Sequence, residues 1–160
     1  MENREKDFVY ITYIATTPEK LWQALIEPAF TRQYFFGVEF ETDWKPSSVI
    51  QVPGPEGKKQ QCGRVHHFEP PRLLAYTFDG PAHGPGGERR ATLATFEIQA
   101  HGGGVRLYLT HSHLEPADLD PRKDTFAGLN NGWPAILSSL KSLVETGAPL
   151  ELTQRWPKDF

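Results

Sequence analysis

The sequence has little of several residue types and patterns, and each shortage excludes a class of protein. Cys62 is the only cysteine among 160 residues, which excludes an internal disulfide and a cysteine-based zinc site. No apolar run approaches the roughly 20 residues of a transmembrane helix, and the opening MENREKDFVY lacks the apolar centre of a signal peptide. The net charge is −3 with both signs interspersed, so there is no basic footprint for nucleic acid or a membrane surface. We therefore expect a cytoplasmic protein with no nucleic-acid partner and no membrane insertion.

Motifs that mark familiar active sites are also missing. The sequence has no G-x-S-x-G nucleophile elbow, no phosphate-binding loop and no H-E-x-x-H zinc motif. His111 and His113 are two residues apart and His66 and His67 are adjacent, but a metal would need a third ligand from elsewhere. We expect no metal and no cofactor. Whether the chain is an enzyme stays open at this point, with a non-catalytic role favoured.

What the sequence does contain is one long amphipathic helix. In GWPAILSSLKSLVETG (Gly132 to Gly147), apolar residues recur every three or four positions and therefore share one face. Pro134 is tolerated in the first turn, and Gly147 suits the position just past the end. We expect this helix to cover a sheet. The predicted organisation is a single domain over residues 1–147, followed by a C-terminal tail over residues 148–160 with weak local structure.

Most of the remaining chain is typical of strands joined by turns. Strands are predicted at Phe8 to Ile14, Val38 to Trp44, Val49 to Val52, Cys62 to Phe68, Leu73 to Phe78, Ala91 to Gln99 and Val105 to His113. Two short helices follow the first strand, one starting at Pro18 after a Thr17 cap and one at Pro28. Hairpin connections imply an antiparallel sheet and an α+β fold. Gly80 to Gly87 is predicted to be a loop, either a plain hairpin turn or a gate at a cavity mouth.

Four segments carry a family resemblance in addition. They are Ala15 to Leu25 (ATTPEKLWQAL), Asp43 to Ser48 (DWKPSS), Gly63 to Phe78 (GRVHHFEPPRLLAYTF) and Gly132 to Gly147. In this order they resemble the START-like helix-grip superfamily, also called SRPBCC, and within it the group related to the activator of the heat-shock protein 90 ATPase. Ser47 departs from the DWKPGS turn of that group, and His66 and His67 replace an aliphatic and an acidic residue.

The resemblance implies a helix-grip (START-like, Bet v-like) fold. A curved antiparallel sheet of six or seven strands would wrap around the long C-terminal helix, with two short helices after the first strand and an elongated apolar cavity between sheet and helix. Members of the superfamily bind lipids, hormones or polyketides, catalyse aromatase or cyclase steps, or act as co-chaperones in the stress response. Fold alone does not choose among these activities.

Strand parity and helix periodicity select the side chains that would face one another between sheet and helix. They either interdigitate as a solid core or line a hollow, and the resemblance favours the hollow. The predicted cavity residues are Phe40, Trp44, Leu74, Tyr76, Phe78, Phe96, Ile98, Leu107, Leu109, His111, Trp133, Ile136, Leu137 and Leu140.

His111 is the polar residue of greatest interest in this set. It shares a strand face with Leu107 and Leu109 and should point inward. A buried histidine without a hydrogen-bond partner costs roughly 1–3 kcal/mol, so it must have one. His111 either orients a ligand or acts as an acid or base, or it is a core histidine bonded to the backbone or to Tyr76.

Three functions of different classes remain open. The first is binding of a small hydrophobic molecule, lipid-, polyketide- or aromatic-like, in the cavity. The second is a cavity enzyme of the cyclase or hydrolase type that uses His111. The third is a co-chaperone-like interaction domain acting on the heat-shock protein 90 ATPase. The expected partners are a small apolar ligand first, then a homodimer paired through an edge strand such as Phe8 to Ile14, and a chaperone.

Overall fold

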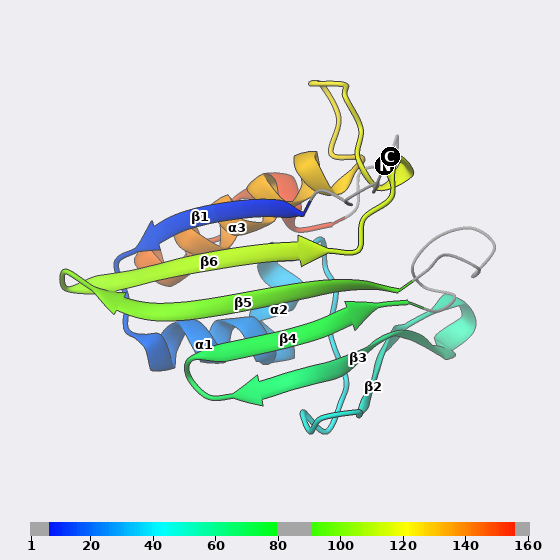
Figure 1. The fold of residues 1–160 in the computed structure, drawn as a ribbon, viewed down its shortest axis with the longest axis horizontal. Coiled ribbons are helices and arrows are strands. Elements are labelled where there is room, and N and C mark those ends of the chain that lie inside the picture. Colours follow the sequence, from blue (N-terminus) through cyan, green and yellow to red (C-terminus); the bar gives the residue numbers. More distant parts are fainter. Residues whose placement is uncertain (1–6, 80–90, 156–160) are drawn as a thin grey trace, which may run out of the picture.

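Six strands form one antiparallel sheet in the computed structural model, which describes residues 7–79 and 91–155 (Figure 1). The spatial order is β1-β6-β5-β4-β3-β2, so the first strand pairs with the last, and β2 to β6 form a meander. The strands are β1 (Phe8–Ile14), β2 (Val49–Pro53), β3 (Lys59–Glu69), β4 (Leu73–Phe78), β5 (Thr92–His101) and β6 (Gly104–Ser112). The predicted α+β helix-grip fold is confirmed.

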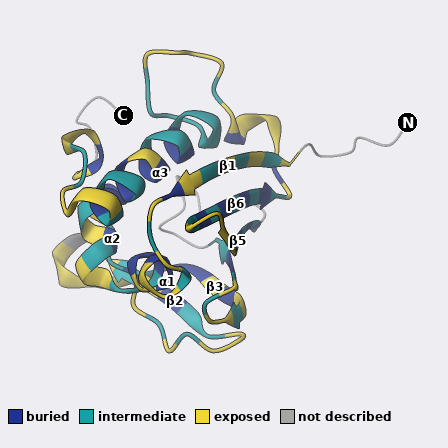
Figure 2. Ribbon diagram, turned by 90° about the vertical axis from the view of Figure 1, so that its left-hand side faces the viewer, coloured by how far each residue is buried: buried dark blue, intermediate teal, exposed yellow. Residues whose placement is uncertain are grey.

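The three α-helices of the described ranges lie on one face of the sheet (Figures 1 and 2). They are α1 (Pro18–Ile26), α2 (Pro28–Tyr34) and α3 (Leu129–Thr146), and the 3₁₀ turns are η1 (Pro55–Gly57), η3 (Pro116–Asp118) and η4 (Glu151–Thr153). The predicted start of α1 is confirmed, because Thr17 accepts the backbone N–H of Lys20 at 3.3 Å and Pro18 is the first helical residue. None of the helices in the described ranges is long and apolar enough to span a membrane.

The long helix α3 begins at Leu129, three residues before the predicted start at Gly132. Asn130 extends it, because its side chain accepts the N–H of Asp120 at 2.9 Å and donates to the carbonyl of Asp120 at 2.7 Å. These bonds tie the first turn to the preceding connection. Pro134 consequently lies inside the helix rather than in its first turn. Gly147 ends α3 with a left-handed φ of 86°, as predicted.

The strand predicted over Val38 to Trp44 is wrong. The segment makes only an isolated bridge between Glu41 and Gln51 of β2. Left-handed backbone interrupts it at both ends, with φ of 78° at Gly37 and 53° at Trp44. Alternation of side-chain types carries no information about such φ angles, so the pattern alone predicted a strand.

The last predicted strand also ends one residue early. β6 stops at Ser112, and His113 has a φ of 65° and is exposed. His113 therefore does not continue the inward face of His111, which removes the basis for pairing the two as metal ligands. The other strand boundaries agree with the prediction within three residues.

The part of the tail up to residue 155 packs against the body, contrary to the expectation of weak structure. The N–H of Phe36 donates to the Thr153 carbonyl at 2.7 Å, and the N–H of Leu150 donates to Ser139 Oγ at 2.9 Å. Thr153 is fully buried. Residues 148–155 are thus part of the folded unit, while the predicted Gly80 to Gly87 loop and Trp156 lie outside the described residues. The boundary at residue 147 stays a prediction.

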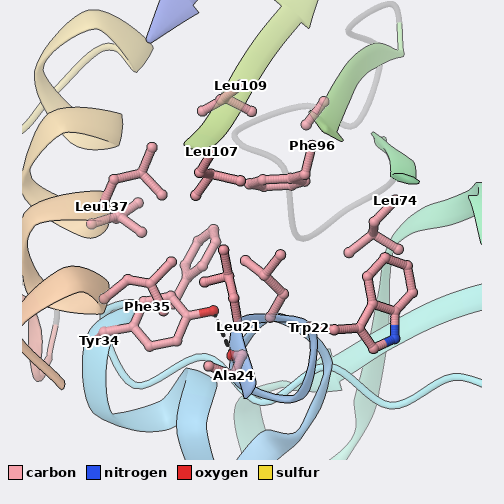
Figure 3. Packing of buried hydrophobic residues seen from close by; sticks show 14 of the residues in the cluster. Leu21, Trp22, Ala24, Tyr34, Phe35, Leu74, Phe96, Leu107, Leu109 and Leu137 are labelled. Atoms are coloured by element: carbon pink, nitrogen blue, oxygen red, sulfur yellow. Dashed lines mark hydrogen bonds between the residues drawn. The ribbon is translucent and has the colours of Figure 1, made fainter. Parts of the chain in front are cut away.

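The core fills the layer between the sheet and the helices. Leu107 and Leu109 of β6 and Phe96 of β5 point from the sheet toward Leu137 of α3 and Leu21 of α1 (Figure 3). Such interlocking apolar burial stabilises at about 25 cal/mol per Å² removed from water. The site proposed below lies at one end of this core.

Candidate functional site

The predicted cavity residues are all buried in the structure, except Trp44 and Phe78, which are half-buried. Trp44 also lies apart from the rest. It stacks on Phe68 of β3 with ring centroids 5.8 Å apart, and Trp22 of α1 contacts the same Phe68 ring edge-on at 5.1 Å. Trp44 therefore belongs to a separate aromatic group under α1 and does not line the end of the core where the other predicted aromatic residues meet.

Aromatic rings gather where β4 and β6 end and α3 begins. Trp133 of α3 is at the centre, with ring centroids 5.6 Å from Phe35, 5.7 Å from Phe96, 5.9 Å from His111 and 6.1 Å from Phe78. Tyr76 and Phe40 continue the group on the other side of Phe96 and Phe35. We call this set the aromatic cluster: Phe35, Phe40, Tyr76, Phe78, Phe96, His111 and Trp133.

His111 is completely buried and bonded through both ring nitrogens. The indole N–H of Trp133 donates to Nδ1 at 2.9 Å, and Nε2 lies 2.7 Å from Thr92 Oγ1. An indole nitrogen can only donate, so Nδ1 is the acceptor and the proton of the neutral ring is on Nε2, from which it is donated to Thr92. The described partners are thus two side chains rather than the backbone or Tyr76, which the sequence suggested.

Tyr76 is only 3 % exposed and its ring is surrounded by Phe40, Phe78 and Phe96 at centroid distances of 5.4 to 5.7 Å. Burial, with smaller contributions from Tyr34 and Cys62, raises the pKa of Tyr76 well above its ordinary value. The Tyr76 hydroxyl makes no hydrogen bond within the described ranges, whereas the Tyr34 hydroxyl donates to the Ala24 carbonyl at 2.8 Å. The Tyr76 hydroxyl is not among the fully buried polar atoms that lack a partner, so it retains contact with solvent and has unused bonding capacity.

Cys62 of β3 lies near Tyr76 and is a free, buried thiol. Burial, and to a smaller extent the charge of Asp79, raises the pKa of Cys62 to about 12. The thiol is therefore protonated at neutral pH and is not an activated nucleophile. In the described part of the chain, no three His, Cys, Asp or Glu side chains come close enough to hold a metal ion.

Sequence reasoning missed two members of this region. Thr92 is buried and bonds His111, and its parity with Ala94 and Phe96 along β5 would have placed it on the inward face. Phe35 packs edge-on against Trp133. Phe35 follows directly after α2, and nothing local in the sequence indicated that it would meet a residue almost one hundred positions later.

Comparison with known proteins places the chain in a family. The model of the family described as activator of Hsp90 ATPase homolog 1-like protein matches residues 15–145, which is most of the chain. The chain belongs to this family. No curated protein matches the chain at a significant level.

Solved structures agree with this Aha1-like assignment at the level of the fold. Protein MLL2253 from Mesorhizobium loti is 22 % identical with a TM-score of 0.66, over 86 % of this chain and 96 % of that one. The Aha1 dimer from Colwellia psychrerythraea is 21 % identical with a TM-score of 0.64, over 89 % and 98 %. DynU16, a putative protein in the dynemicin biosynthetic locus, is 17 % identical with a TM-score of 0.64, over 94 % and 49 %. The predicted family resemblance is thereby confirmed.

Proposed function

We propose that this Aha1-like chain binds a small hydrophobic molecule between the sheet and α3, at the aromatic cluster. The observation that carries the proposal is the Tyr76 hydroxyl, a polar group that still reaches solvent on a side chain otherwise enclosed by aromatic rings, with no hydrogen-bond partner in the described ranges. The hydroxyl of a tyrosine whose ring is buried usually finds a hydrogen-bond partner. A ligand oxygen or nitrogen beside Tyr76 supplies that partner.

The cluster also limits the chemistry of the ligand. Its rings present aromatic faces and edges, and its members carry no formal charge because the bonding of His111 requires the neutral ring. A charged group would be desolvated there without a counter-ion, at a cost of several kcal/mol. We therefore propose an uncharged, flat, lipid-, polyketide- or aromatic-like ligand with one polar group directed at Tyr76. The likeness to DynU16, from a biosynthetic locus, supports the same class.

The test is a thermal-shift screen of neutral polyketides, flavonoids and fatty alcohols, followed by calorimetric titration of any compound that raises the melting temperature. Tyr76→Phe should weaken binding of such a compound about tenfold, which corresponds to one hydrogen bond of about 1.4 kcal/mol. Tyr108→Phe on β6 is the matched control, because Tyr108 pairs with exposed Ile11 on the other face of the sheet. Equal affinities of wild type and Tyr76→Phe would exclude the proposed contact, and a screen without hits would exclude the ligand class.

A second candidate is a co-chaperone activity on the heat-shock protein 90 ATPase. The family match favours it, since the family is described by that activity. The test adds the purified chain to heat-shock protein 90 and measures ATP hydrolysis together with association. Stimulated hydrolysis with a saturable dose response supports this function. If the chain does not associate with heat-shock protein 90 and leaves its rate of ATP hydrolysis unchanged, this function is excluded.

A cavity enzyme that uses His111 ranks lower. Both ring nitrogens have fixed side-chain partners in Thr92 and Trp133, so proton transfer to a substrate would first break one of these bonds. The same bonds suit a residue that holds the wall of the cluster in place. Unchanged turnover of any identified substrate by His111→Gln would remove the catalytic role, whereas loss of turnover with retained substrate binding would restore it.

A further inference from the structure

A small depression lies on the outer face of the sheet, between β5 and β6. The α-helices of the described ranges all lie on the opposite face (Figure 2). The depression has a volume of about 130 Å³, and it is lined by Glu97 and Gln99 of β5 and by Arg106 and Tyr108 of β6. These four residues have the opposite strand parity to the buried ones, so their side chains point away from the core. The depression is therefore separate from the aromatic cluster.

The register of the two strands places opposite charges on this outer face. Tyr108 lies directly opposite Glu97, and Arg106 lies directly opposite Gln99. Glu97 and Arg106 are consequently diagonal neighbours, about 7 Å apart at Cβ, a separation that long side chains can bridge. They nevertheless form no ion pair with each other or with another group in the described ranges. One carboxylate and one guanidinium thus remain available to a ligand beside the same small depression.

The Arg106 side chain is held in position, yet its donors are unused. The central carbon of the guanidinium lies 5.4 Å from the centroid of the Tyr108 ring, and this cation–π contact orients the group. The Nε atom is enclosed and has no acceptor among the described residues. A buried donor without an acceptor is rare in folded proteins and indicates a missing partner. The Gln99 amide also makes no side-chain hydrogen bond within the described part of the chain.

We propose that this depression binds a small zwitterion, with a carboxylate on Arg106 and an ammonium group on Glu97. The planar guanidinium offers two parallel N–H donors to a carboxylate, and a small rotation of Arg106 brings Nε into that bidentate pair. The Gln99 amide, directly opposite Arg106, donates to the same carboxylate. Glu97 accepts from the ammonium group, and its own charge repels a ligand that carries only a carboxylate. We call the four lining residues the zwitterion site.

The size of the zwitterion site limits the ligand further. Its volume of about 130 Å³ is well below the range of about 300–1,000 Å³ that is typical of pockets for larger small molecules. The ligand therefore has few non-hydrogen atoms, and short amino acids are compounds that carry both charges within that size. Because so few atoms make contact in an open site, we expect a dissociation constant on the order of 1 mM.

The test is a titration of the full chain followed by its backbone amide signals in nuclear magnetic resonance, at constant ionic strength. The probes are two zwitterions, alanine and 4-aminobutyrate, and two compounds with a single charge, propionate and propylamine. We expect at least one zwitterion to shift the Gln99 and Arg106 amide signals saturably. Each single-charge compound should bind at least about tenfold more weakly, the effect of losing one charge-assisted hydrogen bond. The proposal is overturned if neither zwitterion binds there, or if a single-charge compound binds as tightly.

Substitutions at the two charges separate their roles. Arg106→Gln and Glu97→Gln should each weaken binding of the zwitterion about tenfold. Glu97→Gln should at the same time strengthen binding of propionate, because it removes the repulsion, and general damage to the fold would not produce that gain.

Two control variants should bind the zwitterion as the wild type does. Arg72→Gln removes an exposed arginine that pairs with Glu69 and does not line the depression. Tyr76→Phe alters the aromatic cluster on the other face of the sheet, so the two proposed sites are tested independently. If Arg106→Gln and Glu97→Gln keep the melting temperature and the wild-type affinity, the zwitterion site is refuted.

Discussion

The indole N–H of Trp133 donates to Nδ1 of His111, which connects the first half of α3 to the end of β6. The bond is buried, and Thr92 of β5 extends it on the other side of the imidazole. Strands β5 and β6 and helix α3 are thereby fixed relative to one another by two hydrogen bonds. In an otherwise apolar layer, such directional contacts specify one arrangement of helix on sheet.

Replacing Trp133 with phenylalanine should destabilise the fold by more than the lost ring area explains. The change leaves Nδ1 of His111 buried without its donor, which adds about 1–3 kcal/mol to the packing cost. Trp22→Phe is the matched control, because Trp22 is also buried and makes no described hydrogen bond through its indole. Urea unfolding of both variants measures the difference. Equal losses of unfolding free energy would mean that the Trp133–His111 bond contributes nothing net.

Ser47→Gly should stabilise the protein. Ser47 has a φ of 73°, a left-handed conformation that costs a non-glycine residue about 1–2 kcal/mol. Its described hydrogen bonds, from its N–H to the Val65 carbonyl and to its carbonyl from Arg64, involve only backbone atoms of Ser47 and survive the change. Glycine also gives the unfolded chain more conformational entropy, which offsets part of this gain. The net increase in unfolding free energy, measured by thermal or urea unfolding, should be about 0.5–1 kcal/mol.

The neighbouring Ser48 offers the control for this change. Its Oγ accepts the N–H of Lys45 at 3.3 Å, and its φ is not left-handed. Ser48→Gly should therefore lower the unfolding free energy by about 0.5–1 kcal/mol. If both serine variants shift stability in the same direction, left-handed strain at Ser47 is not the cause.

Gly63→Ala should be strongly destabilising. A Cβ added at Gly63 would lie 1.7 Å from the carbonyl oxygen of Thr77 on β4, so the two strands would have to separate. Overpacking against backbone costs about 1–3 kcal/mol and often more. In Gly132→Ala the nearest atom is the Phe126 carbonyl oxygen at 3.5 Å, and a helical alanine gains about 0.5–1 kcal/mol over glycine. Urea unfolding should therefore give a lower unfolding free energy for Gly63→Ala and a higher one for Gly132→Ala. An unchanged unfolding free energy in Gly63→Ala would contradict the close approach of the two strands.

Alkaline pH should destabilise the fold partly through Cys62. Its pKa is about 12 in the fold and 9.0 in the unfolded chain, so between these values the unfolded state loses a proton that the folded state keeps. The stabilisation from the buried neutral thiol is complete below pH 9 and declines as pH rises toward 12. Unfolding midpoints in urea between pH 7.5 and about pH 10.5 should fall, and Cys62→Ala should show a shallower fall. Parallel slopes for both proteins would contradict the role of the thiol.

Local pattern was enough to predict the elements that build this fold. The alternation in β4 placed Leu74 and Tyr76 on the inward face, and the three-and-four spacing in α3 placed Leu137 and Leu140 against them; all four are buried. The departure of Ser47 from the family turn was also visible in the sequence, and the structure gives it a physical meaning in a left-handed φ. Periodicity predicts burial because the apolar residues of each element lie on one face, and that face packs against the core.

Features that depend on register between distant segments could not be predicted. The bond between Trp133 and His111 requires α3 to pack on β6 with these two residues side by side. The local sequence pattern of either element does not specify this alignment. Trp44 was expected to line one end of the cavity, at the end of a strand that does not form; its backbone is left-handed and its ring stacks on Phe68 instead. The position of the Tyr76 hydroxyl, at the margin of a ring enclosed by Phe40, Phe78 and Phe96, could be identified only after these neighbours had been placed. Chain pattern therefore determines which side chains go inside, and three-dimensional register determines which of them meet.

The pairing of the first strand with the last has a consequence for biosynthesis. Phe8 lies opposite His111, so the N-terminal strand emerges from the ribosome about one hundred residues ahead of the strand that receives it. At roughly 5–20 residues per second, that interval is on the order of 5–20 s. During this time FVYITYI is an uncharged, unpaired segment on a nascent chain. Its inner edge is protected only once β6 has been made, so the first strand to be synthesised is among the last to be paired.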